Sequence, residues 1–386
     1  MTPIQYFLLA VAAISFIYYL IALYSAGRFF LLARSQKAAR PDYAPPVSNL
    51  KPVRGVDPGA YDNFASYCRQ DYPNYELVFC TGDESDPCVP VVQKLMRDFP
   101  QTRIRLIFCA YHGAVNDKVA KLRRLVEAAE HDVLVINDAD VRVKPDYLRT
   151  VVAPLQDPKV GAVTCMYTST GESSFAEELQ AIGMICDFYP GILVAWQLDG
   201  VKFAFGQTMV TTKARIAGFG GYRTLENLPA DDLLLGRRID EQGYTVVLLP
   251  YTVETVADFQ STSGLLDKRL RWMTVMRNMR PWGHLGLVFT HGFAWSVLAF
   301  VVHPTLFVAA AYLGGYAFFR VAITLLVGAF GVKQPRLLRK LPLIPIWDGT
   351  AFLVWVASFG RSTIRWRGVD YKLTGGRLIP TDKVND

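Results

Sequence analysis

No side chain between Met1 and Gly27 is charged, and this run restricts the fold more than any other feature of the chain. As a helix, the apolar stretch that starts at Ile4 is about 36 Å long, which is enough to cross the hydrocarbon core of a bilayer. A cleaved secretory signal is the alternative, but the run has no basic start and its apolar core is too long. We therefore expect residues 1–33 to be an uncleaved transmembrane anchor.

A second apolar block extends from Leu285 to Val332, and its one formal charge is Arg320. The block is long enough for two spanning helices, and His303-Pro304 or Gly314-Gly315 could mark their break or bends. A third apolar segment, Leu341–Gly360, contains Pro342, Pro345 and Asp348. Residues 284–360 are thus predicted to form a C-terminal membrane region.

Basic residues decide the expected orientation of these segments. They follow the anchor, occupy residues 333–340, and recur in the tail, residues 361–386. The positive-inside rule places all three, together with residues 43–283, in the cytoplasm. Two crossings within 285–332 satisfy this arrangement and a complete third would not, so we expect Leu341–Gly360 to be re-entrant or interfacial.

Between the apolar ends, residues 43–283 alternate between strand and helix patterns, which predicts an α/β fold with a mostly parallel sheet. The expected strands are Val47–Leu50, Glu76–Cys80, Arg105–Phe108, Val133–Ile136 and Gly161–Tyr167. The expected helices between them are Pro58–Gln70, Val89–Asp98, Lys118–Glu130 and Pro145–Ala153. A looser second half follows, with helices Phe175–Asp187 and Ala230–Gln242 around a Gly-rich stretch, and a strand Thr245–Leu249 that Pro250 stops.

Two carboxylates, Asp138 and Asp140, follow the buried strand 133–136 directly. In open α/β sheets, ligands bind outside the carboxyl ends of the strands. Two hard oxygen ligands one residue apart suit Mg²⁺ or Mn²⁺, and such a metal suits a diphosphate. The alternative for an isolated Asp-X-Asp is a simple turn.

Further acids occur at two other places. Asp86 lies in a loop after the strand that ends at Cys80, where a nucleotide-binding acid or a helix cap is expected. Asp231 and Asp232 open a helix, where acids favour the helix dipole. Neighbouring helical residues point about 100° apart, so at most one of this pair can face a site squarely. One of them could serve as a general base that takes a proton from an attacking hydroxyl.

A basic cluster precedes the second apolar block. Lys268, Arg271 and Trp272 have helical spacings of three and four and share one face. An interfacial helix beside a membrane segment is the alternative interpretation.

Composition restricts the partners. The chain is 51% hydrophobic and 19% charged, which is too apolar for an ordinary soluble enzyme. Its six cysteines show no metal-binding spacing and are expected to be reduced core residues. The net charge of +7 gathers around the membrane segments, so it indicates anionic lipid headgroups and no nucleic acid.

Taken together, these clusters resemble the inverting GT-A glycosyltransferases of the family-2 superfamily and, more closely, the ceramide glucosyltransferase family (glycosyltransferase family 21). That family shows three spaced acids followed by (Q/R)xxRW. In this chain, Asp86 in ESDPCVPVVQKL resembles the first acid, Asp138 in INDAD the second and Asp232 in ADDLLLGRR the third. Lys268-xx-Arg271-Trp272 is similar to the last element, with Lys in place of Gln or Arg. The stretches NDKVAKL, GQTMVTTKARIAGFGGY and IRWRGVDYKLTGGRL are similar as well. Asp140, a Gly in eukaryotic members, favours the bacterial branch, which includes hopanoid-associated enzymes.

The resemblance implies a GT-A domain with a Rossmann-like, mixed, mostly parallel sheet over residues 43–283. It implies that Asp232 is the catalytic base, that Asp138 and Asp140 hold a divalent metal and the diphosphate, and that Asp86 holds the nucleotide. Arg271 and Trp272 would contact the diphosphate or acceptor, with Asp231 and Lys268 in support.

The expected function is transfer of a hexose, glucose first, from a UDP-sugar to a lipid hydroxyl such as that of ceramide. We expect a multi-pass protein of the bacterial inner membrane with its catalytic domain in the cytoplasm. The alternative acceptor is a hopanoid lipid that receives N-acetylglucosamine. A processive polysaccharide synthase would need more spanning helices. A non-catalytic, membrane-anchored nucleotide-binding scaffold is the rival from another class.

Overall fold

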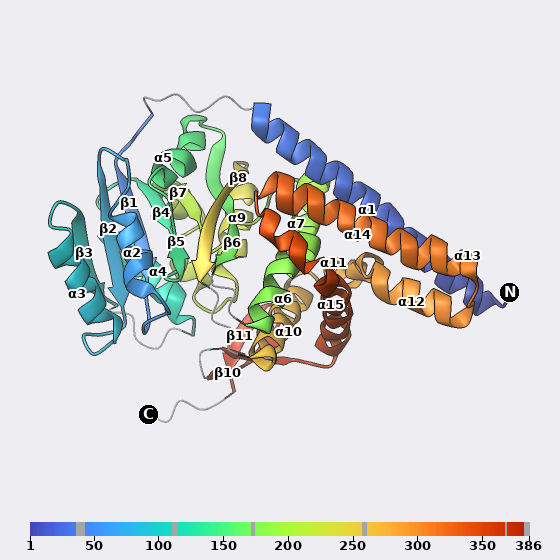
Figure 1. The fold of residues 1–386 in the computed structure, drawn as a ribbon. Coiled ribbons are helices and arrows are strands. Elements are labelled where there is room, and N and C mark those ends of the chain that lie inside the picture. The colour runs from blue at the N-terminus through green and yellow to red at the C-terminus, as the bar shows by residue number, and fades with distance from the viewer. Residues whose placement is uncertain (36–42, 110–114, 171–173, 257–260, 367–368, 382–386) are drawn as a thin grey trace.

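The computed structural model describes residues 1–35, 43–109, 115–170, 174–256, 261–366 and 369–381. An α/β unit built on a mixed eight-stranded sheet lies at one end, and a group of long helices extends away from it (Figure 1). Helix α1 (Pro3–Ser35) runs from the far tip of this group back to the α/β unit. It packs along α12 (Gly292–Val302) and α14 (Gly315–Thr324), so the two apolar ends of the sequence lie side by side.

The large sheet has the strand order β3-β2-β1-β4-β7-β6-β8-β5. Its strands are β1 (Val47–Pro52), β2 (Tyr75–Thr81), β3 (Arg103–Phe108), β4 (Val133–Ile136), β5 (Val141–Arg142), β6 (Val160–Thr170), β7 (Met209–Thr212) and β8 (Thr245–Val256). Strands β1 to β4 pair in parallel, as β6 does with β8. Antiparallel β7 joins β4 to β6, and short β5 pairs antiparallel with β8. The expected mixed, mostly parallel sheet is confirmed.

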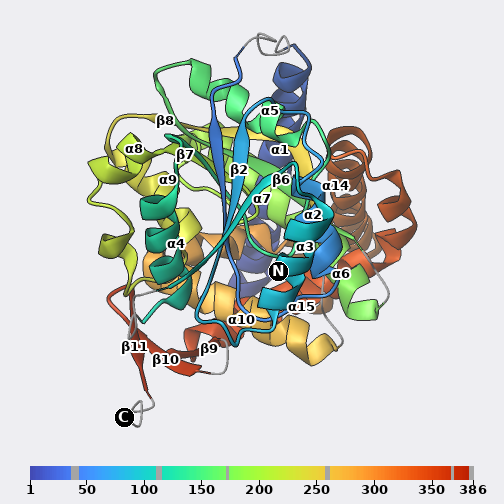
Figure 2. The same cartoon turned by 90° about the vertical axis from the view of Figure 1, so that its left-hand side faces the viewer.

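Helices cover both faces of the parallel half of the sheet. Figure 2 shows α4 on one side of β1 and β2, with α2 and α3 on the other. The helices of the α/β unit are α2 (Ala60–Tyr67), α3 (Cys88–Asp98), α4 (Asp117–Ala128), α5 (Tyr147–Val152), α8 (Lys213–Gly218) and α9 (Asp231–Glu241), with 3₁₀ turns η1 (Ala153–Gln156) and η3 (Tyr222–Leu225). Asn116 caps α4, because its side chain accepts a hydrogen bond from the Val119 amide.

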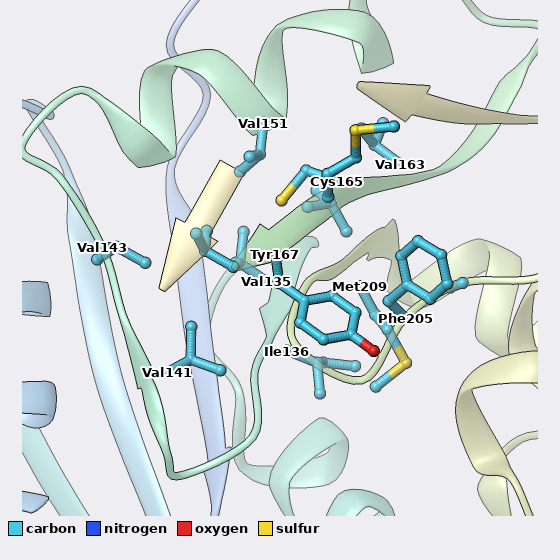
Figure 3. Packing of buried hydrophobic residues seen from close by; sticks show 14 of the residues in the cluster. Val135, Ile136, Val141, Val143, Val151, Val163, Cys165, Tyr167, Phe205 and Met209 are labelled. Carbon is cyan, nitrogen blue, oxygen red and sulfur yellow. The ribbon is translucent and has the colours of Figure 1, made fainter. Parts of the chain in front are cut away.

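The core of the α/β unit lies where β4 meets the antiparallel strands. Val135 and Ile136 pack there with Val163, Cys165 and Met209 (Figure 3). All four residues of β4 are buried, which explains its continuous apolar sequence. None of the six cysteines, which all lie in described residues, forms a disulfide, and five are buried.

Two sequence-based boundaries are wrong. Strand β8 does not stop at Pro250 but continues to Val256, because the pairing with β6 shifts register beside Pro250 and so absorbs the missing amide. The helix expected at Phe175–Asp187 continues to Asp199: α6 (Phe175–Gly183) passes through a π-helical segment η2 (Met184–Phe188) into α7 (Tyr189–Asp199). The π-helical turn keeps the axis continuous although Pro190 follows it.

Among the residues that the structure describes, four helices are long and apolar enough to cross a membrane: Pro3–Ala33, Phe175–Asp199, Leu306–Gly331 and Pro335–Phe359. The pair Pro281–Thr290 and Gly292–Val302, bent by 52°, is a further candidate. The elements after the α/β unit are α10 (Thr262–Met279), α11 (Pro281–Gly286), η4 (Leu287–Thr290), α12, α13 (Leu306–Val308), η5 (Ala309–Gly314), α14, η6 (Leu325–Gly331), η7 (Pro335–Leu343) and α15 (Ile344–Phe359). The predicted break at His303-Pro304 is confirmed, whereas Gly314-Gly315 lies inside a continuous helix. A re-entrant or interfacial path for 341–360 stays a prediction.

A buried ion pair joins two of these helices. The guanidinium of Arg320 on α14 binds the Asp348 carboxylate on α15 and the Cys186 carbonyl on η2. The Tyr316 hydroxyl donates to the same carboxylate at 2.8 Å. The one formal charge of the second apolar block is therefore paired inside the helical group.

The basic tail is folded. It contains the antiparallel sheet β9 (Thr363–Trp366), β10 (Val369–Thr374) and β11 (Arg377–Pro380). From the sequence, these residues are identified by their charge and by the family-like stretch IRWRGVDYKLTGGRL, and no strands are predicted there. Ile364, Tyr371, Leu373 and Leu378 form a small apolar cluster on this sheet.

Candidate functional site

The carboxyl end of β4 carries the first part of the site. The Asp138 amide donates to the Gly206 carbonyl at 3.0 Å, and the Lys51 ammonium donates to the Asp138 carbonyl at 3.2 Å. Lys51 is fully buried and lies 3.4 Å from the centre of the Tyr67 ring. The backbone of the Asp-X-Asp turn is thereby held in place. Of its two carboxylates, that of Asp140 lines the adjoining cavity, and that of Asp138 pairs with Lys118.

Asp140 faces a cavity of about 230 Å³ at this sheet edge. The polar residues in its wall are Asp57, Asp140, Ser169, Gln180, Gln207, Thr255 and Lys268, and the larger apolar ones are Tyr167, Met184 and Trp272. Burial, and then the charge of Asp138, raise the pKa of Asp140 to about 6. A cationic group in this cavity would therefore be stabilised.

Helix α9 carries the second pair of acids, Asp231 and Asp232, and places Asp232 beside Gly206. Asp232 accepts hydrogen bonds from the Gly206 amide at 3.1 Å and from the Leu233 amide at 2.8 Å. Asp231 is buried and points elsewhere, to Lys118. Burial, and then the charge of Asp231, raise the pKa of Asp232 to about 6. Ala230, just before the helix, adopts the left-handed conformation with φ of 56°, a strain that clusters at functional sites.

Gly206 joins the two acid clusters, and sequence reasoning did not single it out. A Cβ atom at this position would lie 2.6 Å from an Asp138 carboxylate oxygen. A residue with a side chain would therefore displace either that carboxylate or the 203–207 segment. The signal in the sequence was the G of GQT, at the start of a stretch that the family resemblance includes.

Lys118 is the second residue that sequence reasoning missed. Its ammonium lies 2.8 Å from Asp138 and 3.0 Å from Asp231. Burial acts to lower the pKa of Lys118, but the charges of Asp138 and Asp231 hold it well above its usual value. Lys118 lies on the first turn of α4, and its position in NDKVAKL, a stretch that the family resemblance includes, was the available signal.

Helix α10 supplies one wall of the cavity. Lys268 and Trp272 line it, with the Lys268 ammonium 5.2 Å from the Trp272 ring, and burial lowers the pKa of Lys268. The described lining does not include Arg271, so the expected three-residue face is only partly brought to the cavity. Arg269 points the other way, to Asp187 at 3.6 Å and over the Trp347 ring.

Asp86 is not among the described residues that line the cavity. Its carboxylate accepts from the amides of Gly55 and Cys88, both at 2.9 Å. Burial opposes ionisation, but the bond from Cys88 and its neighbours lowers the pKa of Asp86. Asp86 thus pins the loop after β1, whose residues Asp57 and Pro58 do reach the cavity.

The acids at the β4 end fit a divalent metal that also has ligands from its substrate. Within the described ranges, no group of three or more His, Cys, Asp or Glu side chains is arranged as a protein-only metal site. Mg²⁺ and Mn²⁺ are commonly bound by one or two carboxylates together with substrate phosphates. Asp138 and Asp140 supply such a pair, and the raised pKa of Asp140 reflects negative charge that a cation would offset.

The chain is similar to known proteins along most of its length. The model of the family described as Glycosyl transferase family 21 matches residues 7–379. The chain is 22% identical to Ceramide glucosyltransferase 1 of Caenorhabditis elegans over 97% of this chain and 82% of that protein. It is 24% identical to Ceramide glucosyltransferase 3 of the same organism, over 87% and 74% of the two chains. A Ceramide glucosyltransferase of Gibberella zeae is 29% identical over 38% of this chain and 28% of the relative.

One solved structure shows the same fold. It is a mannosyltransferase from Pyrobaculum calidifontis in complex with GDP-Man and Mn²⁺, which is similar to this chain with a TM-score of 0.57 and 18% identity. The match covers 90% of this chain and 99% of the other. The expected GT-A fold is confirmed.

Proposed function

The chain belongs to glycosyl transferase family 21 and is a glycosyltransferase, and from this premise we propose that it moves a hexose from a nucleotide sugar to a lipid hydroxyl. The donor we propose is UDP-glucose and the acceptor is ceramide or a related membrane lipid. The observation that carries the proposal is the hydrogen bond that ties the Asp232 carboxylate, through Gly206, to the strand end of Asp138 and Asp140.

We assign the proton transfer to Asp232. A hydroxyl that attacks the sugar carbon must lose its proton, and a carboxylate with a pKa near 6 is ionised and able to accept it at neutral pH. The Gly206 and Leu233 amides hold both oxygens of this carboxylate in one orientation. One base on the acceptor side gives inversion at the sugar carbon.

The departing diphosphate belongs to the Asp138 and Asp140 side of the site. A divalent metal held by these carboxylates would offset the charge that develops on the leaving group. Lys118 and Lys268 add positive charge on either side, Lys118 against Asp138 and Lys268 in the cavity wall. Trp272 presents an aromatic surface in the same wall.

The residues that lie next to the cavity support a lipid acceptor. A second cavity, of only about 10 Å³, shares Tyr167, Ser169 and Met184 with it, and its wall also includes Thr168, Ala181, Ile185, Tyr189, Gln334 and Leu337. Leu337 belongs to η7, at the start of a candidate membrane span. An acceptor with a polar hydroxyl end and an apolar chain matches a polar cavity that lies beside this candidate span. We therefore propose that the active site lies beside the membrane, at its cytoplasmic face as the basic loops predict.

The test is transfer by the purified full chain in detergent or lipid nanodiscs. UDP-glucose, UDP-N-acetylglucosamine and GDP-mannose are each offered with ceramide or a hopanoid polyol, and the lipid products are identified by mass spectrometry. We expect glucosylceramide from UDP-glucose. A product only from UDP-N-acetylglucosamine and the hopanoid would replace this acceptor and sugar with the alternative. Donor binding without any product would favour the non-catalytic scaffold.

A further inference from the structure

The C-terminal sheet β9–β11 packs against the segments that carry the charged residues of the site. Its apolar cluster covers Val115, which precedes α4, and Val275, which lies on α10 one turn after Arg271. In Figure 2, β10 and β11 lie below the end of α4 and beside α10. Sequence reasoning assigned these residues no role beyond their positive charge.

Two hydrogen bonds connect the sheet to two separate loops. The Tyr371 hydroxyl on β10 donates to the Val115 carbonyl at 3.3 Å. The Leu378 amide on β11 donates to the Asn227 carbonyl at 2.9 Å. Leu378 is paired with Leu373, whose own amide donates away from β11 to Ser362, so this is a pair in which both amides point outward. The Leu378 amide is thus available to Asn227 without loss to the β10–β11 ladder.

Asn116 joins these two loops to each other. Its amide donates to the Glu226 carbonyl and its side-chain nitrogen donates to the Leu228 carbonyl, both at 2.9 Å. The Asn116 side-chain oxygen also caps α4. Two residues later, Lys118 reaches Asp138 and Asp231. Any movement of the loop at Val115 is therefore passed to the lysine between the two acid clusters.

We propose that the sheet β9–β11 is a positioning element of the active site, in which Tyr371 and Leu378 clamp the loops at Val115 and Asn227 and so hold Lys118 between Asp138 and Asp231. The cavity wall, as far as the structure describes it, contains no residue of this sheet, so these are positioning residues and not catalytic ones. The proposal rests on the function proposed above for Asp232 and its neighbours.

The attachment of the sheet to the rest of the fold supports this role. Arg277 on α10 donates to the carbonyl of Phe359, the last residue of α15, and to that of Arg361, which lies between α15 and β9. The start of the sheet is thereby fixed to the helix that carries Lys268 and Trp272. One small sheet thus contacts three segments that lie next to charged residues of the site: the residues just before α4, the loop before α9, and α10.

The experiment compares Tyr371→Phe and Leu378→Pro with Lys372→Ala, an exposed neighbour on β10. Each change in the first two removes one clamping hydrogen bond. For Tyr371→Phe, which keeps the buried ring, we expect kcat to fall about three- to tenfold, the effect of one neutral hydrogen bond, while KM for UDP-glucose and the melting temperature stay as in the parent. Leu378→Pro should lower kcat at least as much, and it should also lower the melting temperature because it removes a buried leucine side chain from the apolar cluster. Hydrogen exchange should become faster in residues 115–121 and 226–233 and nowhere else. Lys372→Ala should behave as the parent.

A second comparison asks whether the effect passes through Lys118. In a Lys118→Arg background, Tyr371→Phe should lower kcat by less than it does in the parent, because both changes act on the same contact. Full additivity, or unchanged exchange in both peptides, would overturn the proposal. Hydrogen exchange is measured without substrate, so it tests whether the sheet holds the two loops even if the parent protein transfers no sugar. Absence of transfer by the parent would instead contradict the proposed function.

Discussion

The backbone amide of Gly206 donates a hydrogen bond of 3.1 Å to the carboxylate of Asp232. The carbonyl of the same glycine accepts from the Asp138 amide at 3.0 Å. One peptide segment therefore sets the spacing between the proposed base and the proposed diphosphate site. We therefore expect a change in either acid cluster to alter the position of the other, because both are hydrogen-bonded to this glycine.

Asp232→Asn should abolish most of the turnover. An amide has no basic oxygen for the acceptor proton, and loss of general base catalysis costs about 10²- to 10⁴-fold in kcat. The amide keeps the shape of the carboxylate, so binding of the donor should persist, measured by calorimetry. Asp240→Asn, later on the same helix, is the control and should keep parental kcat. Turnover by Asp232→Asn at the parental rate would contradict the assignment.

The pH dependence of kcat/KM should show an acid limb near pH 6. The pKa of Asp232 is raised to about 6, so its carboxylate is ionised above that pH and is protonated, and inactive as a base, as the pH falls below it. Asp140 has a pKa in the same range, but its protonation competes with metal binding. Raising the metal concentration should therefore shift the apparent pKa that Asp140 contributes to the profile and leave the pKa contributed by Asp232 unchanged. An acid limb near pH 4 at saturating metal would contradict this.

Gly206→Ala should reduce kcat by about 10²-fold or more, because the new methyl group would lie 2.6 Å from an Asp138 carboxylate oxygen. Gly82→Ala is the matched control, since a Cβ atom there would meet nothing within 4 Å. Both variants are compared by steady-state kinetics and by thermal unfolding. Equal activity of the two variants would show that the approach of Gly206 to Asp138 has no part in the reaction.

Chelation with EDTA should stop transfer, and Mg²⁺ or Mn²⁺ should restore it. Asp140→Asn removes one of the two proposed metal ligands, so the metal concentration that gives half-maximal activity should rise about tenfold or more. Asp132→Asn, an exposed acid just before β4, should leave that concentration unchanged. Full activity in EDTA would exclude a metal-dependent reaction.

Arg320→Ala should destabilise the helical group strongly. It leaves the buried Asp348 carboxylate without its ionic partner, and breaking such a pair costs about 3–5 kcal/mol. The drop in melting temperature is measured in detergent, with the exposed Arg336→Ala as control. The double change Arg320→Met with Asp348→Leu should regain most of the stability, because no uncompensated charge remains. A melting temperature of Arg320→Ala equal to that of the parent would contradict this.

Local patterns in the sequence predicted the elements of the fold that depend on near neighbours. The parallel strands at the start of the sheet, the helix that begins at Asp231, and the break at His303-Pro304 all follow from periodicity, capping and proline chemistry over a few residues. The same reasoning failed at Pro250, because the bulge that carries β8 past the proline depends on pairing with β6. Antiparallel β7 was missed for a similar reason: its place is set by the strands on either side.

The candidate site divides in the same way. Asp138, Asp140 and Asp232 could be selected because acids that follow a buried strand or open a helix are visible locally. Lys118 and Gly206 could not, since a lysine on an amphipathic helix and a glycine in a loop are ordinary features until their partners are known. Of the acids Asp86, Asp138, Asp140 and Asp232, only Asp140 lines the described cavity. Asp138 and Asp232 are joined to each other through Gly206, whereas Asp86 and Arg271, which matched the motif equally well, are not in the cavity wall.

By itself, the sequence determined that this protein has apolar ends long enough for a membrane, an α/β centre and acids at the strand ends, because composition and short-range periodicity carry that information. Only the tertiary structure decided which residues contact one another. Gly206 and Asp232 are 26 residues apart, and Tyr371 and Val115 are 256 apart. Contacts at such separations depend on how the whole chain packs, and no local pattern records them.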